Sequence, residues 1–193
     1  MMGFGGGDRR GSVRTILAVD DSRTNLNVLG ARLGQLGYLM VLSDRGREAL
    51  DLIAGRGIDL VLLDMVMPVM SGVDVLTELR SSRDTADLPV IMVTGRTEPT
   101  AAVEALAAGA DDWIAKPFAF EVLAARIERT LARASRLAEL KRSNWALDAR
   151  IAQRAIELGE AKAELAASKA DRNRLIASIQ ALHDEVERLS QIA

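Results

Sequence analysis

Five polar residues follow short apolar stretches of the chain, and together they carry the groups that phosphoryl transfer uses. They are Asp20, Asp21, Asp64, Thr94 and Lys116. Carboxylates brought close together repel one another, so such a cluster needs protons or a bound cation, and Mg²⁺ prefers oxygen ligands of this kind. A lysine and a threonine hydroxyl nearby supply a positive charge and a donor for phosphoryl oxygens. The combination predicts formation of an acyl phosphate on an aspartate.

The elements that must position these residues alternate along the chain. Runs rich in Val, Ile and Leu predict five strands, at residues 15–21, 38–43, 58–64, 88–95 and 112–117. Helical patterns between them cover residues 25–37, 46–57, 73–82 and 100–109. Because the apolar runs lack polar alternation, we expect strands that are buried on both faces and joined by helical crossovers. This pattern predicts a five-stranded parallel, doubly wound α/β sheet.

In such a sheet, ligands bind beyond the carboxyl ends of the strands. The five polar residues end four of the five predicted strands, so we expect them to meet at one edge. A single aspartate at a strand end is usually a turn or helix-cap residue, and a single Lys-Pro pair usually has no role. Because all five residues are placed at strand ends, a shared binding site is favoured over a separate turn or capping role for each.

Four motifs resemble the receiver domain of bacterial two-component response regulators. They are AVDDS (18–22), DMVMPVMSG (64–72), VTG (93–95) and AGADDWIAKPF (108–118). The resemblance covers residues 14 to about 130 and includes the spacing between the motifs. It implies a flavodoxin-like receiver domain at residues 14–134. It also implies that Asp64 accepts a phosphoryl group from a phosphohistidine of a partner histidine kinase or phosphotransfer protein, and that the chain is a signalling protein and not an enzyme.

The resemblance assigns a role to each residue of the site. It implies that Asp21 and Asp64 bind Mg²⁺ together with the backbone carbonyl of Val66, whereas Asp20 acts largely through water. Thr94 and Lys116 would contact the phosphoryl oxygens. It further implies a cis peptide bond between Lys116 and Pro117, which an X-Pro amide permits at low cost.

Further positions around the site have expected roles. We expect Met67-Pro68 to turn the chain off its strand and Gly72 to let the next helix begin close to Asp64. Trp113 occupies a place where the family usually has a tyrosine or phenylalanine that swings inward on activation, although a simple packing role is equally compatible. Val66 and Arg96 hold the positions that, in the family, tune dephosphorylation. An apolar Val66 should not orient a water, which favours a long-lived phosphoryl state.

The last third of the chain predicts one long helix. No proline or glycine stops the helical pattern that begins after Phe118, and residues 135–193 are predicted as a coiled coil because apolar residues recur there at alternating spacings of three and four. Gly159 costs about 1 kcal/mol of helix propensity, and the polar stretch 168–172 weakens the seam. A hairpin folded back on itself is the alternative, but no turn signal lies between residues 135 and 190.

The seam predicts a homodimer. The residues that carry this prediction are Asn144, Leu147, Ile151, Leu158, Leu165, Leu175, Ile179, Leu182, Val186 and Leu189. Asn144 falls at an a position of the heptad, where a buried amide favours a two-stranded, parallel, in-register pair.

Composition excludes several other classes. The 25 basic and 27 acidic residues leave a net charge of −2, which gives no electrostatic reason to expect nucleic acid or an anionic membrane as a partner. The chain contains no cysteine, which excludes disulfides and thiolate metal sites and fits a cytoplasmic location. No apolar run is long enough to span a membrane. The glycine-rich residues 1–13 are interpreted as a flexible tail, because they precede the first strand instead of linking a strand to a helix.

Two alternatives to a response regulator remain. The chain resembles the regulatory front of a histidine kinase or nucleotide cyclase, since residues 145–168 look like a linker helix, although no residues are left for an output domain. The second alternative is a docking adaptor. The stretch LHDEV around His183 resembles a histidine phosphoacceptor box, but an exposed coiled-coil histidine is the favoured interpretation.

Overall fold

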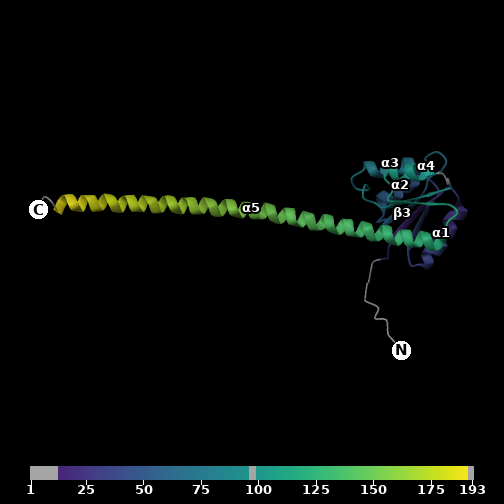
Figure 1. Cartoon of the computed structure of the whole chain (residues 1–193), viewed down its shortest axis with the longest axis horizontal. Helices are drawn as coiled ribbons and strands as arrows, with labels where there is room; N and C mark the ends of the chain where they lie inside the picture. Colours follow the sequence, from purple (N-terminus) through teal and green to yellow (C-terminus); the bar gives the residue numbers. More distant parts are fainter. Residues whose placement is uncertain (1–12, 96–98, 191–193) are drawn as a thin grey trace, which may run out of the picture. The chain divides into compact units, whose positions relative to one another are not determined.

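The computed structural model describes residues 13–95 and 99–190, with side chains described as far as residue 184 (Figure 1). The chain divides into two compact units, Met1–Ala138 and Glu139–Ala193. The predicted tail at residues 1–13 lies outside the described residues except for Val13, which is exposed.

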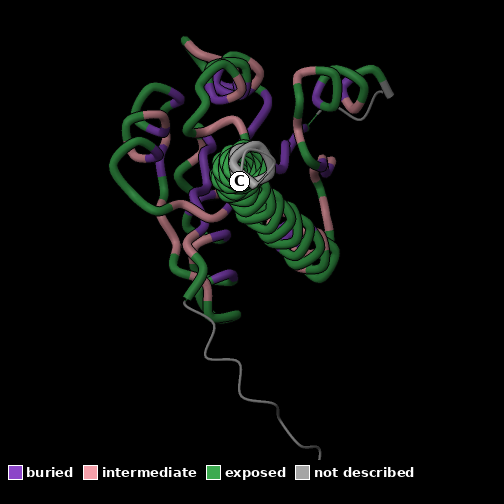
Figure 2. The backbone as a smooth tube through the Cα atoms, turned by 90° about the vertical axis from the view of Figure 1, so that its left-hand side faces the viewer, coloured by how far each residue is buried: buried purple, intermediate pink, exposed green. Residues whose placement is uncertain are grey.

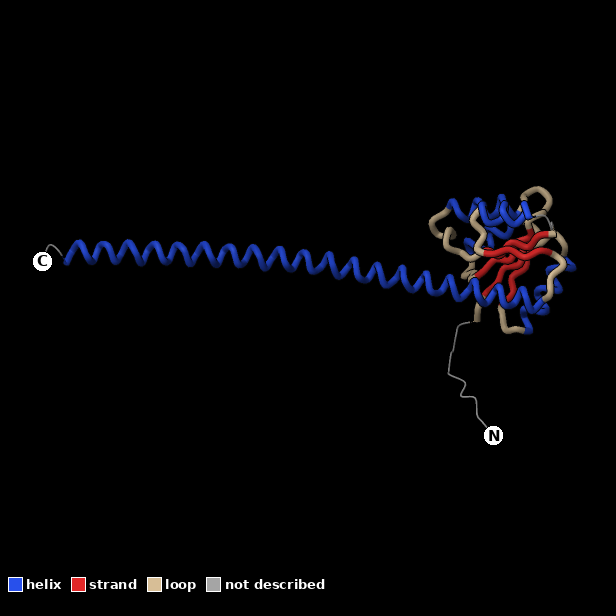
Figure 3. The backbone as a smooth tube through the Cα atoms, viewed as in Figure 1, coloured by secondary structure: helices blue, strands red, loops and turns tan. Residues whose placement is uncertain are grey.

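The first unit is built on a five-stranded sheet in which every strand pair is parallel, as predicted. Figure 3 shows the sheet in red among the blue helices. The strands are β1 (Thr15–Val19), β2 (Leu39–Ser43), β3 (Leu60–Asp64), β4 (Val90–Thr94) and β5 (Asp112–Ala115). Their order in the sheet is β2-β1-β3-β4-β5. This order reverses direction next to β1, which creates the crevice beyond the carboxyl ends of β1 and β3 where ligands bind in doubly wound sheets.

Helices join the strands as crossovers. They are α1 (Arg23–Gln35), α2 (Gly46–Gly55), α3 (Gly72–Ser81), α4 (Pro99–Ala107) and α5 (Phe120–Ser190). Each boundary falls within a few residues of its prediction. Gly37, just past α1, has a φ of 90°, the left-handed conformation in which glycine ends helices.

The core lies on both faces of the sheet, because side chains alternate between the faces along each strand. On one face, Leu17, Val61 and Leu63 pack beneath α2, α3 and α4. On the other face, Ile16 and Leu62 pack beneath α1 and the first turns of α5. The strands β3 and β4 are buried along their whole length, which explains their unbroken apolar sequences.

The prediction of burial on both faces is wrong for β2. Leu39 and Leu42 in this strand are 57% and 38% exposed, because β2 lies at the edge of the sheet and helices cover it incompletely. The first strand is also shorter than predicted. It ends at Val19, so Asp20 and Asp21 lie in the loop that follows it.

The helix α5 continues without interruption for 71 residues and passes through Gly159. Every described side chain from residue 135 to 184 is exposed, as the green tube in Figure 2 shows. Among the residues described, no helix combines the length and apolar character that crossing a membrane requires.

Candidate phosphoacceptor site

The three predicted carboxylates converge at the carboxyl edge of the sheet. Asp64 is the last residue of β3, and Asp20 and Asp21 follow β1, the neighbouring strand. One carboxylate oxygen from each lies within 4.8 Å of the others. Asp20 and Asp64 are buried, whereas Asp21 is exposed to solvent. The acidic cluster that the sequence predicts is therefore present in the fold.

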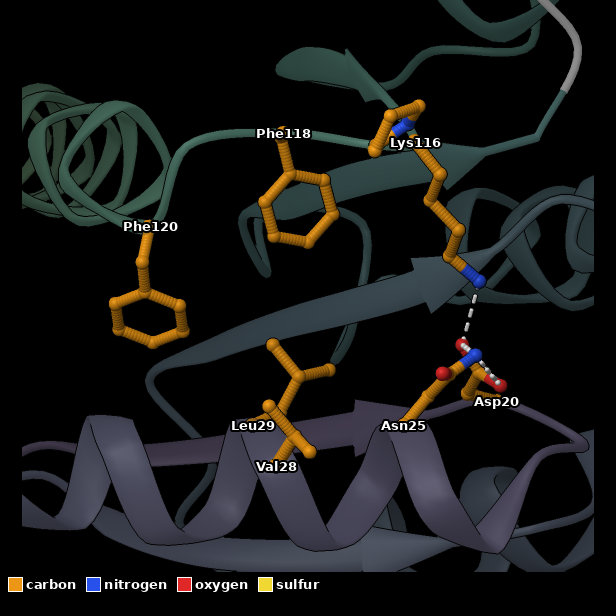
Figure 4. Close-up of a pocket in the computed structure, with 8 residues that line it drawn as sticks. Asp20, Asn25, Val28, Leu29, Lys116, Phe118 and Phe120 are labelled. Carbon is orange, nitrogen blue, oxygen red and sulfur yellow. Dashed lines mark hydrogen bonds and ion pairs between the residues drawn. The ribbon is translucent and has the colours of Figure 1, made fainter.

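Lys116 reaches into this cluster from the end of β5. Its Nζ donates to Asp20 Oδ2 and to Asp64 Oδ2, each at 2.6 Å, and Figure 4 shows the side chain extending toward Asp20. One ammonium group cannot balance three carboxylates. The site therefore retains an excess of negative charge on closely spaced oxygen atoms, and this is the donor set that fits a hard divalent cation such as Mg²⁺.

Burial and the contacts between Asp64 and Lys116 shift the pKa values of both groups. Burial raises the pKa of Asp64 above its ordinary value, while the hydrogen bond and charge of Lys116 and the Val66 N–H oppose that rise. Burial also acts to lower the pKa of Lys116, but its hydrogen bonds to Asp20 and Asp64 outweigh burial, so that the pKa is raised. Lys116 thus stays charged and holds one oxygen of Asp64 in place.

Asp20 has further partners that the sequence did not reveal. The Asn25 side-chain amide donates to both of its oxygens, at 3.0 and 3.2 Å, and the Ser22 backbone N–H donates to Oδ1 at 2.9 Å. Ser22 is also the N-cap of α1, accepting from the Asn25 backbone N–H. Asn25 is missed by sequence reasoning because a polar residue in the first turn of a helix is ordinary, and only the fold shows that it faces Asp20.

The loop after Asp64 folds back tightly onto the end of β3. The Val66 N–H donates to Asp64 Oδ1 at 3.2 Å. A γ-turn follows, in which the Met70 N–H donates to the Pro68 carbonyl at 2.8 Å and Val69 has a φ of 70°. The chain turns at Met67-Pro68, as predicted.

Gly72 begins α3 directly behind Asp64. Its N–H donates to the Met65 carbonyl at 3.0 Å, and a Cβ added here would collide with the backbone carbonyl of Asp64. The prediction that glycine allows this helix to begin close to Asp64 is confirmed.

The remaining predicted site residues lie on β4 and β5. Thr94, the last residue of β4, is buried, and its carbonyl accepts from the Lys116 N–H at 2.7 Å. Trp113 is half-buried and packs against the core beneath α2, α3 and α4. The Lys116–Pro117 bond is cis, as the resemblance implied. Arg96 lies outside the described residues.

A partly apolar cavity of about 310 Å³ adjoins the carboxylates (Figure 4). It lies between α1 and the segment joining β5 to α5, and its lining includes Asp20, Lys116, Val28, Phe118 and Phe120. The Arg32 guanidinium lies over the Phe120 ring, 5.3 Å from its centroid, on the same part of the surface. No pattern in the sequence indicates this cavity, because its two walls are about 90 residues apart along the chain.

The predicted dimer seam lies on α5. Its members from Asn144 to Leu182 are exposed, and so is His183. The side chains of Val186 and Leu189 lie outside the described residues.

Comparison with known proteins agrees with this geometry. A family model described as the response regulator receiver domain matches residues 16–128. The response regulator MprA of Mycolicibacterium vanbaalenii is 46% identical over 118 residues, which cover 61% of this chain and 50% of that protein. The chain spans about half the length of the curated relatives it matches.

Solved structures share the fold. The chemotaxis protein CheY4 of Vibrio cholerae is 32% identical, with a TM-score of 0.59 over 62% of this chain and 99% of that one. The response regulator TrrA of Thermotoga maritima, solved in complex with Mg²⁺-BeF, is 30% identical, with a TM-score of 0.55 over 61% of this chain and 99% of that one. Since the family model matches well over half of the residues and the site motifs stand at the carboxyl edge of the matching fold, the chain belongs to the response regulator receiver domain family.

Proposed function

We propose that this protein is a response regulator that accepts a phosphoryl group on Asp64 and passes the resulting change on through a dimeric coiled coil. The observation that carries the proposal is the position of Lys116, whose Nζ lies 2.6 Å from one oxygen of Asp64 and 2.6 Å from Asp20, beside a third carboxylate. A buried carboxylate held by a lysine at the mouth of a parallel sheet has the features of a phosphoacceptor.

In the proposed step, an oxygen of the Asp64 carboxylate forms a bond to the phosphorus of a phosphohistidine. The P–N bond breaks, and the departing imidazole nitrogen keeps the electron pair and takes up a proton. Lys116 is placed to hold a phosphoryl oxygen, and Thr94, buried at the end of the neighbouring strand, to donate to another.

The residues fit a bound Mg²⁺, which when present would neutralise charge on the phosphoryl oxygens. Asp21, Asp64 and the carbonyl of Val66 would hold it. Asp20 is suited to an indirect role through water, because Lys116, Asn25 and the Ser22 N–H already engage its oxygens.

The phosphodonor must bring its histidine to Asp64, so it must contact the surface around the site. The cavity between α1 and Phe118 offers apolar surface there, and Val28 is half exposed beside it. A partner histidine kinase or phosphotransfer protein would cover this surface while the histidine reaches the carboxylate.

Two residues bear on how long the phosphoryl group lasts. Val66 is 57% exposed next to Asp64, and an apolar side chain there gives an attacking water no hydrogen-bond partner. We propose a long-lived phosphoryl state on this ground. The family resemblance implies that Arg96 also tunes dephosphorylation and that Trp113 takes part in the switch on activation.

The tail supplies the proposed output. An exposed row of leucine and isoleucine along a single helix is unfavourable in water, and pairing with a second helix would bury it. We propose a cytoplasmic homodimer in which phosphorylation at the sheet edge alters α5 and thereby the paired helices.

Labelling of the full chain tests the proposed chemistry. Incubation with a small acyl phosphate and Mg²⁺ should add one phosphoryl group, measured by intact mass, and a chelator of Mg²⁺ should prevent it. Asp64→Asn should abolish the addition, whereas Asp51→Asn, a change at an exposed acid on α2, should leave it unchanged. Equal labelling of Asp64→Asn and the natural chain would overturn the proposal.

A further inference from the structure

We propose that charged residues beside the seam of α5 make the chain pair with a second copy of itself in one orientation and register. In this pair, Glu157 and Glu164 of each chain face Lys162 and Lys169 of the other. The inference rests on the proposed dimer and specifies its partner, its direction and the residues that select both.

The positions of these four residues follow from the seam. With Asn144 at an a position, Glu157 and Glu164 fall at g, and Lys162 and Lys169 fall at e. In a parallel, in-register pair, each g residue faces the e residue five positions later on the partner helix. Glu157 therefore faces Lys162, and Glu164 faces Lys169. By symmetry each attraction occurs twice.

The opposite orientation brings like charges together. In an antiparallel pair, g residues flank g residues and e residues flank e residues. The carboxylates of Glu157 and Glu164 would then share one side of the seam, and the ammonium groups of Lys162 and Lys169 would share the other. Such repulsion disfavours the antiparallel dimer, and the attraction favours the parallel one.

The four charges are available for this purpose. All are exposed, and across the described part of the chain Lys162, Glu164 and Lys169 make neither a hydrogen bond nor an ion pair. Among the described residues, Glu157 accepts a hydrogen bond only from the Gln153 amide, at 3.0 Å. None of those three unpaired residues has an opposite charge three or four positions away, the spacing at which helical side chains meet.

The charges also stand where the seam is weakest. Ala161 and Ser168 occupy the d positions of this region, so apolar burial there is small. A seam of small residues tolerates sliding and reversal better than one of large residues. The flanking charges therefore decide the register in this stretch, whereas leucine and isoleucine at other seam positions, including Leu158 and Leu165 at a, provide affinity.

A cysteine cross-link tests direction and register. The natural chain has no cysteine, so Ala161→Cys introduces a single thiol at a d position. In a parallel, in-register dimer of the full chain the two thiols are adjacent, and mild oxidation should convert the protein to a disulfide-linked dimer. Ala163→Cys, two residues away on the outer face, is the matched control and should remain largely uncross-linked. Equal cross-linking of the two variants would overturn the inference.

A charge exchange tests the residues themselves. Glu157→Lys with Glu164→Lys makes one variant, and Lys162→Glu with Lys169→Glu makes the other. Each alone should dimerise roughly 10- to 100-fold more weakly than the natural chain. An equal mixture should form the heterodimer, and the preference should shrink at about 1 M salt because the charges are screened. If both variants dimerise as tightly as the natural chain, the four residues do not select the partner.

The tests of dimer direction and register can fail independently of the test of Asp64 phosphorylation. Labelling of Asp64 is measured on the same variants by intact mass and should be unchanged, because the substitutions lie in the second unit. A labelled protein that dimerises without cross-linking at Ala161→Cys would overturn the register alone. A cross-linked dimer that takes no phosphoryl group would overturn the phosphoacceptor proposal alone.

Discussion

At the scale of single residues, Gly72 is the position where packing behind Asp64 allows no side chain. A methyl group added here would collide with the carbonyl of Asp64 and lie 3.0 Å from Met65 Cα, and backbone cannot move aside as a flexible side chain can. The loop and the start of α3 would have to shift together. Gly72 is thus needed for the position of Asp64 as well as for the helix.

Gly72→Ala should lower the free energy of unfolding by about 2–3 kcal/mol and slow the labelling of Asp64. Gly34→Ala, the matched control in α1, has open space around the added methyl group and should stabilise the protein by about 0.5–1 kcal/mol. Both are measured by urea unfolding through Trp113 fluorescence in a Trp145→Phe background, which removes the exposed second tryptophan. A Gly72→Ala protein as stable as the natural chain would contradict this account.

Tyr38 should make stability depend on alkaline pH. Burial, helped by the charge of Glu128, raises the pKa of its phenol above the ordinary value of about 10. The unfolded chain therefore loses this proton at a lower pH than the folded chain. The stability that the protonated Tyr38 phenol adds to the folded state is fully present below about pH 10. It decreases as the pH rises toward the pKa of the phenol in the folded state.

Tyr38→Phe has no phenol hydroxyl to lose a proton, so this variant serves as the control. The difference in unfolding free energy between the natural chain and Tyr38→Phe should be constant from about pH 7 to pH 9 and should then move in favour of the variant. Urea unfolding of both proteins across this range measures it. A difference that stays flat to about pH 11 would show that the phenol is not perturbed.

At the scale of elements, the sequence predicted the positions of the strands, which depend on the local pattern of apolar residues. The apolar runs located all five strands, and β3 and β4 are buried throughout, as such runs require. It could not predict that β2 would be an edge strand, since edge position depends on strand order, which a run of residues does not encode. It also missed Asn25, the cavity beside the site and the partners of Asp112, because each joins residues that the fold alone brings together.

Asp112 is a contact of this kind, and it links β5 to α5. Its buried side chain, at the start of β5, accepts from Arg126 at 2.6 Å and from Arg129 at 2.8 Å, both on α5. Arg129 is 70% exposed, so its pair is largely screened by water. The pair with Arg126, which is 34% exposed, is the less screened of the two and adds to the apolar packing of Leu123 and Ile127 that holds α5 on the sheet.

Asp112→Ala should destabilise the receiver unit by about 2 kcal/mol, because it leaves the Arg126 guanidinium partly buried without its carboxylate. Glu78→Ala is the control. Glu78 pairs with Arg47 at 3.4 Å on the surface, and its loss should change stability by less than about 0.5 kcal/mol. Unfolding of both variants is followed by Trp113 fluorescence in the same background. Equal effects of the two substitutions would mean that the Asp112 pair is no stronger than a surface pair.

At the scale of the whole molecule, the two proposed activities fall in two different units. The first holds the candidate phosphoacceptor site, and the second carries the predicted seam on a helix whose side chains are exposed as far as residue 184. The proposed association and the proposed phosphoryl transfer therefore depend on separate residues. Each can be removed by substitution without touching the other.

Leu158→Asp with Leu165→Asp should convert the proposed dimer to a monomer. Each substitution removes a large apolar side chain from an a position and places a charge opposite its own copy, which should weaken association by at least about 100-fold. Ala163→Asp, on the outer face of the same helix, should leave the dimer intact. Mass in solution, measured by light scattering at several concentrations, distinguishes the two.

The same variants show whether phosphorylation requires the dimer. The small acyl phosphate reaches Asp64 through the receiver unit alone, so the monomeric variant should be labelled as completely as the natural chain. Retained labelling with lost association would place the seam downstream of the phosphoacceptor, as a responding element. Lost labelling in the monomer, with the control still labelled, would instead make the paired tail part of the receiving site and contradict the separation of the two units.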